Sequence, residues 1–128
     1  MPNFLIKSEI KISNEFEKKG FIKKKIFKKY AIEIRNIIFN AAVKELKIKK
    51  KYKVGFFLNN IHKFVPVEKL NSFRVKIISE INKNLNFKKI FYLLSKPYLD
   101  DLVGNELAMQ NSINLSIQFP GDDSSLLP

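Results

Sequence analysis

Hydrophobic residues recur at spacings of three and four over the first two-thirds of the chain, a pattern typical of helices that bury one face. The longest such pattern runs over 27–48 and predicts a helix with a wide apolar face, suited to packing on a sheet or another helix. A second helix is predicted over 67–82, after Pro66, because proline suits the first turn of a helix. A third is predicted over 87–95, and we expect Pro97 to stop it.

Shorter elements are predicted between and around these helices. Asn14 is the expected N-cap of a short helix that Gly20 ends. The apolar run 54–58 predicts a short strand. After Pro97, a short helical piece is predicted over 98–103.

The periodicity changes to two near the end of the chain. Strands are predicted over 106–110 and 113–119. In the second strand one face is apolar, and it consists of Ile113, Leu115, Ile117 and Phe119. The opposite face meets solvent or lines a polar cavity, and it consists of Asn114, Ser116 and Gln118. The order along the chain is therefore helices first and strands last.

Charge divides the chain at the same place. Residues 1–96 carry 24 basic and 7 acidic side chains, a net +17, whereas residues 97–128 carry no basic and 5 acidic ones, a net −5. We interpret the 128 residues as a single partial domain, with a Lys-rich helical support region over 1–96 and the start of a β core over 97–128.

The net charge of +12 allows a nucleic-acid partner, because neutralised phosphates release counterions. Such binding is disfavoured, since only two of the basic residues are Arg, the side chain best suited to bidentate recognition. No apolar run is long enough to act as a signal peptide or to span a bilayer, so we expect no membrane contact. The chain has no Cys, which fits a cytoplasmic location.

No catalytic constellation is complete in the sequence. His62 is the only histidine, and flanking apolar residues favour a packing role. One His and no Cys cannot form a zinc site. The acidic pairs at 100–101 and 122–123 could bind a hard cation, but adjacent side chains diverge, so a turn or cap role is favoured.

One family resemblance enters through particular segments. The stretch 96–128, which includes Ser112-Ile-Asn-Leu-Ser-Ile-Gln-Phe-Pro-Gly121, resembles the iron(II)/2-oxoglutarate-dependent oxygenases of bacterial surface-carbohydrate gene clusters. Leu58-Asn-Asn-Ile-His-Lys-Phe64 and Leu70-Asn-Ser-Phe-Arg74 look like the helical region of the same family. Phe16-Glu-Lys-Lys-Gly-Phe-Ile22 is similar to the opening segment of phytanoyl-hydroxylase-like oxygenases, a more widespread signal.

The resemblance implies an α+β fold, in which an N-terminal helical layer precedes the first one or two strands of an incomplete double-stranded β-helix (jelly roll). It also implies that this chain is the N-terminal part of an oxygenase and that it ends before the His-x-Asp motif of the iron site. Asn114, Ser116 and Gln118 would face the cosubstrate or substrate cavity, and none would be a metal ligand.

The full-length protein would use iron(II) and 2-oxoglutarate to act on a sugar or sugar-nucleotide intermediate of surface polysaccharide biosynthesis. This chain would bind neither cofactor and would be inactive by itself. The alternatives are a small basic nucleic-acid-binding protein of phage or plasmid origin, whose Lys residues at 23–29 and 47–53 would converge on one face, and an interaction protein that completes its sheet with a partner's strand.

Overall fold

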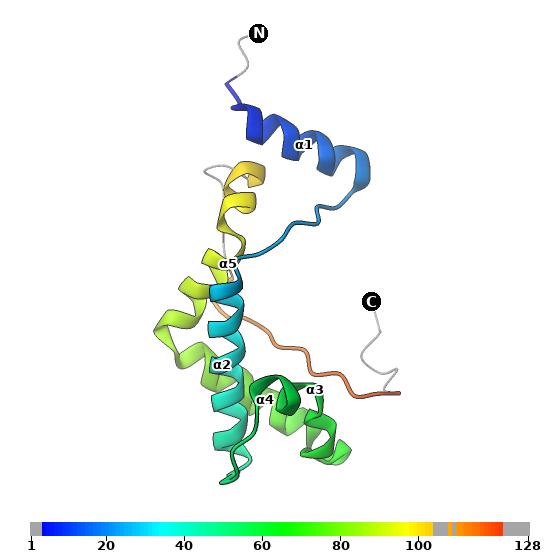
Figure 1. The fold of residues 1–128 in the computed structure, drawn as a ribbon, viewed down its shortest axis with the longest axis vertical. Coiled ribbons are helices and arrows are strands. Elements are labelled where there is room, and N and C mark those ends of the chain that lie inside the picture. The colour runs from blue at the N-terminus through cyan, green and yellow to red at the C-terminus, as the bar shows by residue number, and fades with distance from the viewer. Residues whose placement is uncertain (1–3, 104–107, 109, 122–128) are drawn as a thin grey trace.

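The fold is a set of helices followed by one extended segment (Figure 1). The computed structural model describes residues 4–103, 108 and 110–121. Within them, the α-helices are α1 (Lys7–Lys19), α2 (Lys28–Glu45), α3 (Val54–Asn59), α4 (Leu70–Lys83) and α5 (Leu85–Val103). Two 3-10 turns, η1 (Ile61–Lys63) and η2 (Val67–Lys69), lie between α3 and α4.

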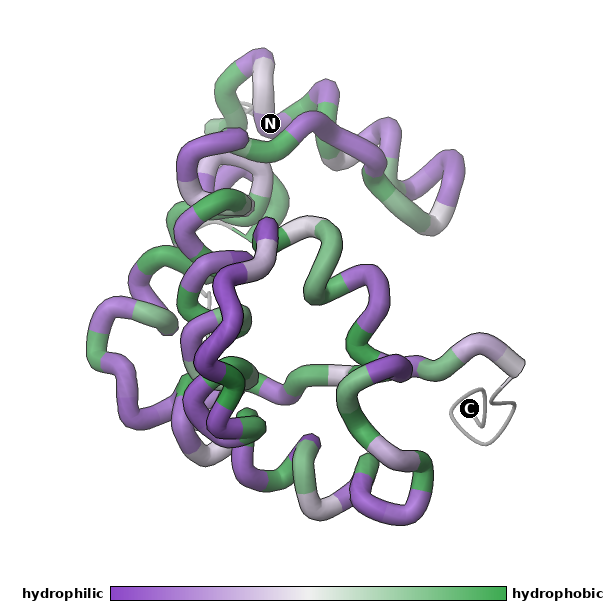
Figure 2. The backbone as a smooth tube through the Cα atoms, turned by 60° about the horizontal axis from the view of Figure 1, so that its bottom comes forward, coloured by the Kyte–Doolittle hydropathy of each residue, from purple (hydrophilic) through white to green (hydrophobic). Residues whose placement is uncertain are grey.

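Helix α2 is the central element, because it packs against α3, α4 and α5. Its small residues Ala41 and Ala42 are buried, which lets neighbouring helices approach its backbone closely. Helix α1 packs on α5 instead, through the buried Ile12, and lies at the far end of the molecule from α3 (Figure 1). Hydrophobic and hydrophilic residues alternate along the helices, as amphipathic packing requires (Figure 2).

The core lies where α2, α3 and α4 meet. Phe57 of α3 is fully buried, and its ring packs edge-on against Phe39 of α2 with centroids 5.2 Å apart. Phe64 lies 4.7 Å from Phe57, and Tyr52 lies 5.2 Å from Phe64. Ile77 of α4 is 1% exposed and belongs to the same cluster. This aromatic centre fixes α3 and the turns after it against the two longer helices.

The two predicted long helices are confirmed. The pattern over 27–48 corresponds to α2, and the pattern over 67–82 corresponds to η2 and α4. Gly20 ends the first helix as predicted, with φ of +73°, a conformation that favours glycine. The predicted start of that helix at Asn14 is wrong, because α1 begins at Lys7. There the Glu9 carboxylate accepts a hydrogen bond of 2.7 Å from the Ile6 backbone N–H.

Two further predictions in the helical region are wrong. The run 54–58 is helical rather than extended, because a helical turn is what places Phe57 in the aromatic cluster. Pro97 does not stop the last helix, since α5 continues through it to Val103. The Leu93 carbonyl loses its helical hydrogen-bond partner, because proline has no N–H. Pro97 is exposed, so this part of the helix is partly solvated.

The predicted α+β fold class is also wrong. No β-strand is present in residues 4–103, 108 or 110–121, so the described chain contains no part of a jelly roll. Residues 113–119 are extended, but they have no neighbouring strand, and a sheet exists only where two strands pair. The other predicted strand, 106–110, lies largely outside the described residues.

Candidate functional site

The extended segment 113–119 is held in place by two side chains of α4. The Asn82 amide donates to the Ile113 carbonyl at 2.9 Å, and its oxygen accepts from the Ile113 N–H at 2.8 Å. The Arg74 guanidinium donates to the Ile117 carbonyl, with an Nε–O distance of 3.0 Å. Asn82 therefore provides Ile113 with the pair of hydrogen bonds that a neighbouring strand would otherwise supply.

The spacing of these two anchors matches the spacing of the residues they hold. From Arg74 to Asn82 the helix rises about 12 Å. From Ile113 to Ile117 an extended chain spans about 13 Å. Because the two lengths agree, α4 fixes the register of the segment as well as its position.

The register decides which side chains of the segment are buried. Ile113, Leu115 and Ile117 are half-buried against the helical core, and Phe119 is only 9% exposed. The alternation of faces predicted from the sequence is therefore present, although the sheet is not. The chain turns at Pro120 and Gly121, where Gly121 has φ of +74°.

The three candidate cavity residues lie on the exposed face of the segment. Ser116 and Gln118 border an apolar cavity of about 250 Å³ beneath the segment, next to Phe73 and Ile77 of α4. Asn114 borders a different cavity, of about 310 Å³, beside α5. The structure therefore does not bring the three residues together around one cavity, and a cosubstrate-binding role stays a prediction.

His62 has a packing contact at the end of the segment. It lies in η1, is half-buried, and meets the Phe119 ring edge-on with centroids 6.4 Å apart. The described residues do not fit an iron site, since nowhere do three or more His, Cys, Asp or Glu side chains gather within them. No step of metal chemistry can be assigned to them.

The carboxylate of Asp100 takes part in a network within α5. The Lys96 ammonium and the Tyr92 hydroxyl both donate to it, the latter at 2.7 Å, and these hydrogen bonds lower the pKa of Asp100. Asp100 therefore serves neither the turn nor the cap expected from the sequence. The pair at 122–123 lies outside the described residues.

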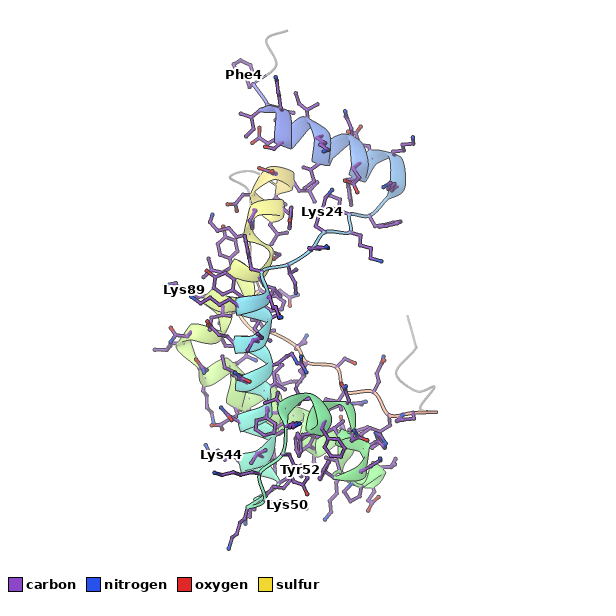
Figure 3. All side chains as sticks on the ribbon, viewed as in Figure 1. Phe4, Lys24, Lys44, Lys50, Tyr52 and Lys89 are labelled. Carbon is purple, nitrogen blue, oxygen red and sulfur yellow. The ribbon has the colours of Figure 1, made fainter. Side chains whose placement is uncertain are left out.

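The two Lys clusters do not converge. Residues 23–29 precede and begin α2, whereas 47–53 follow its C-terminal end. Figure 3 shows Lys24 and Lys50 near opposite ends of this helix. An 18-residue helix is about 27 Å long, so the clusters form two separate basic regions.

Arg74 and Asn82 were not identified as functional residues from the sequence, where Asn82 served only to mark a helix end. One signal was available for Arg74, because it is one of only two Arg residues among 24 basic side chains. An Arg in so Lys-rich a chain indicates a position that needs its planar, multiply donating group.

Comparison with known proteins gives no family. No protein-family model, no curated protein and no solved structure matches this chain. Among the described residues, none of the helices combines the length and the apolarity that crossing a bilayer requires.

Proposed function

We propose that this chain is the N-terminal helical support part of an iron(II)/2-oxoglutarate-dependent oxygenase that acts in the cytoplasm on a sugar or sugar-nucleotide intermediate of surface polysaccharide biosynthesis. The observation that carries the proposal is the extended segment 113–119, fixed on the helical layer by Arg74 and Asn82. It coincides with the part of the chain that resembles this family most closely.

The arrangement agrees with a supporting role. The helices bury one face of the segment and leave Asn114, Ser116 and Gln118 exposed. In this proposal the iron chemistry belongs to the His-x-Asp pair that follows in the family pattern.

The nucleic-acid alternative has less support, because it requires the two Lys clusters to share a face and they lie at opposite ends of α2. Tight DNA or RNA binding that weakens steeply with salt would favour that alternative over the oxygenase.

The coding DNA beyond Pro128 tests the proposal directly. We expect a His-x-Asp pair to follow in the same frame, because in the family this pair comes directly after a strand and a Pro-Gly turn, and 113–121 resembles that stretch in sequence. A protein that includes it should convert 2-oxoglutarate to succinate in the presence of iron(II) and nucleotide sugars. A stop codon at that point, with no such pair in either shifted frame, contradicts the proposal.

A further inference from the structure

The two edges of the extended segment differ. In an extended chain, the backbone N–H and C=O of one residue point to the same edge, and those of the next residue point to the opposite edge. Asn82 and Arg74 bind Ile113 and Ile117, so the odd-numbered residues direct their polar groups toward α4. The even-numbered residues therefore direct theirs away from α4.

The outer edge has no partner within the described chain. The backbone groups of Asn114, Ser116 and Gln118 take part in none of the hydrogen bonds among residues 4–103, 108 and 110–121. The side chains of the three residues are exposed as well. An open edge of this kind is a template for another extended chain.

The outer edge is also self-complementary. Ser116 is the central residue of 113–119, so two copies can pair antiparallel about it. In that register Ser116 lies opposite Ser116 of the second copy, and Asn114 lies opposite Gln118. Every outward N–H and C=O of the three residues then meets a partner, as in the hydrogen-bonded pairs of an antiparallel ladder.

The charge distribution is compatible with this seam. Each chain carries a net +12, so two copies repel one another overall, but the seam lies within 97–128, which contains no basic side chain, and pairing there brings no Lys residues of the seam together. The three seam positions are uncharged, and they pair an amide with an amide and a hydroxyl with a hydroxyl. Such a contact is isologous, since the same patch serves both copies.

We propose that two copies of this chain form a symmetric dimer by antiparallel pairing of their 113–119 segments about Ser116. The inference rests on the edge geometry and on the charge of the chain, and it does not depend on the oxygenase proposal.

Sedimentation equilibrium of the 128-residue chain tests the proposal. We expect the mass to rise from 15.0 kDa toward twice that value with concentration, and to do so more readily at higher salt, because salt screens the repulsion. Ser116→Pro removes the central outward N–H while its φ remains compatible with an extended chain, so it should weaken dimerisation by about tenfold or more. Ser116→Thr keeps the N–H and should dimerise like the wild type. A monomer at all concentrations, or a dimer unaffected by Ser116→Pro, overturns the proposal.

The register is tested by cross-linking, because the chain contains no Cys of its own. In the proposed register the two Ser116→Cys positions lie about 5.5 Å apart between Cα atoms, within reach of a disulfide. The two Asn114→Cys positions lie opposite Gln118 instead and are too far apart. We expect covalent dimers from Ser116→Cys only, and equal yields from both variants overturn the register.

Discussion

Replacing Asn82 by Ala should release the start of the extended segment from α4. The substitution removes both hydrogen bonds to Ile113, at 2.8 and 2.9 Å, and leaves that residue's half-buried N–H and C=O without partners. At a net value of about 0.5–1.5 kcal/mol for each bond, these two bonds account for about 1–3 kcal/mol. The same NH2 group also donates to the Ile78 carbonyl within α4 at 2.8 Å, and the substitution removes that bond as well. The higher helix propensity of Ala returns about 0.5 kcal/mol.

The matched control is Asn36→Ala. Asn36 lies exposed in the interior of α2 and makes no hydrogen bond among the described residues, so this variant carries the propensity gain alone. Urea unfolding of both variants gives the difference in the free energy of unfolding. Amide hydrogen exchange gives the local effect, and we expect the Ile113 N–H to exchange roughly 5- to 150-fold faster in Asn82→Ala. Equal stability of the two variants, with unchanged exchange at Ile113, would refute the anchoring role.

Three further outcomes are expected. Phe119→Ala should lower the free energy of unfolding by about 3 kcal/mol, whereas Phe4→Ala should change it by less than about 0.5 kcal/mol, because Phe119 is 9% and Phe4 is 90% exposed; the urea midpoints of the two variants measure this, and similar midpoints contradict it. Gly20→Ala should destabilise the end of α1 by about 1 kcal/mol, because φ is +73° there, and circular dichroism during urea unfolding would detect the loss. The hydrogen bond from Lys96 lowers the pKa of Asp100, so the ionised Asp100 stabilises the fold above the unfolded-state pKa of 3.8, and this stabilisation disappears as the pH falls through the lower folded-state pKa. The melting temperature of Asp100→Asn, measured by thermal unfolding, should lack this part of the acid dependence. Melting temperatures of variant and wild type that change in parallel at every pH would contradict the prediction.

The sequence predicted correctly those parts of the fold in which a long hydrophobic pattern fits only one type of secondary structure. Helix α2 and helix α4 bury a stripe that repeats over many turns, so local periodicity and tertiary packing agree. Similarly, the alternation in 113–119 predicted correctly which side chains turn inward.

The wrong predictions concern features that depend on distant contacts. A short apolar run such as 54–58 fits a strand or a buried turn of helix equally well, and contact between Phe57 and Phe39 decides for the helix. Helix α5 continues through Pro97 and has contacts with distant parts of the chain: it packs on α1, and the Tyr98 hydroxyl donates to the Lys25 carbonyl at 3.1 Å. The local sequence around Pro97 indicates neither contact. A strand prediction fails for 113–119 because alternation specifies faces but not a neighbouring strand.

The candidate site shows the same limit. Period two places Asn114, Ser116 and Gln118 on one face, yet their exposure and their distribution over two cavities depend on where α4 and α5 lie. The contacts of the two anchors, Arg74 and Asn82, could not be inferred from the sequence. Nothing in the local sequence indicates which backbone group a side chain will bind, and in the case of Asn82 that group is 31 residues away.

The double hydrogen bond of Asn82 also makes the segment sensitive to chemical ageing. Deamidation would convert the donating NH2 group into a second carboxylate oxygen. The Ile113 N–H would keep its acceptor, but the Ile113 carbonyl would face a negatively charged oxygen instead of a donor. The position of the start of the segment, at Ile113, thus depends on the chemical integrity of one amide group.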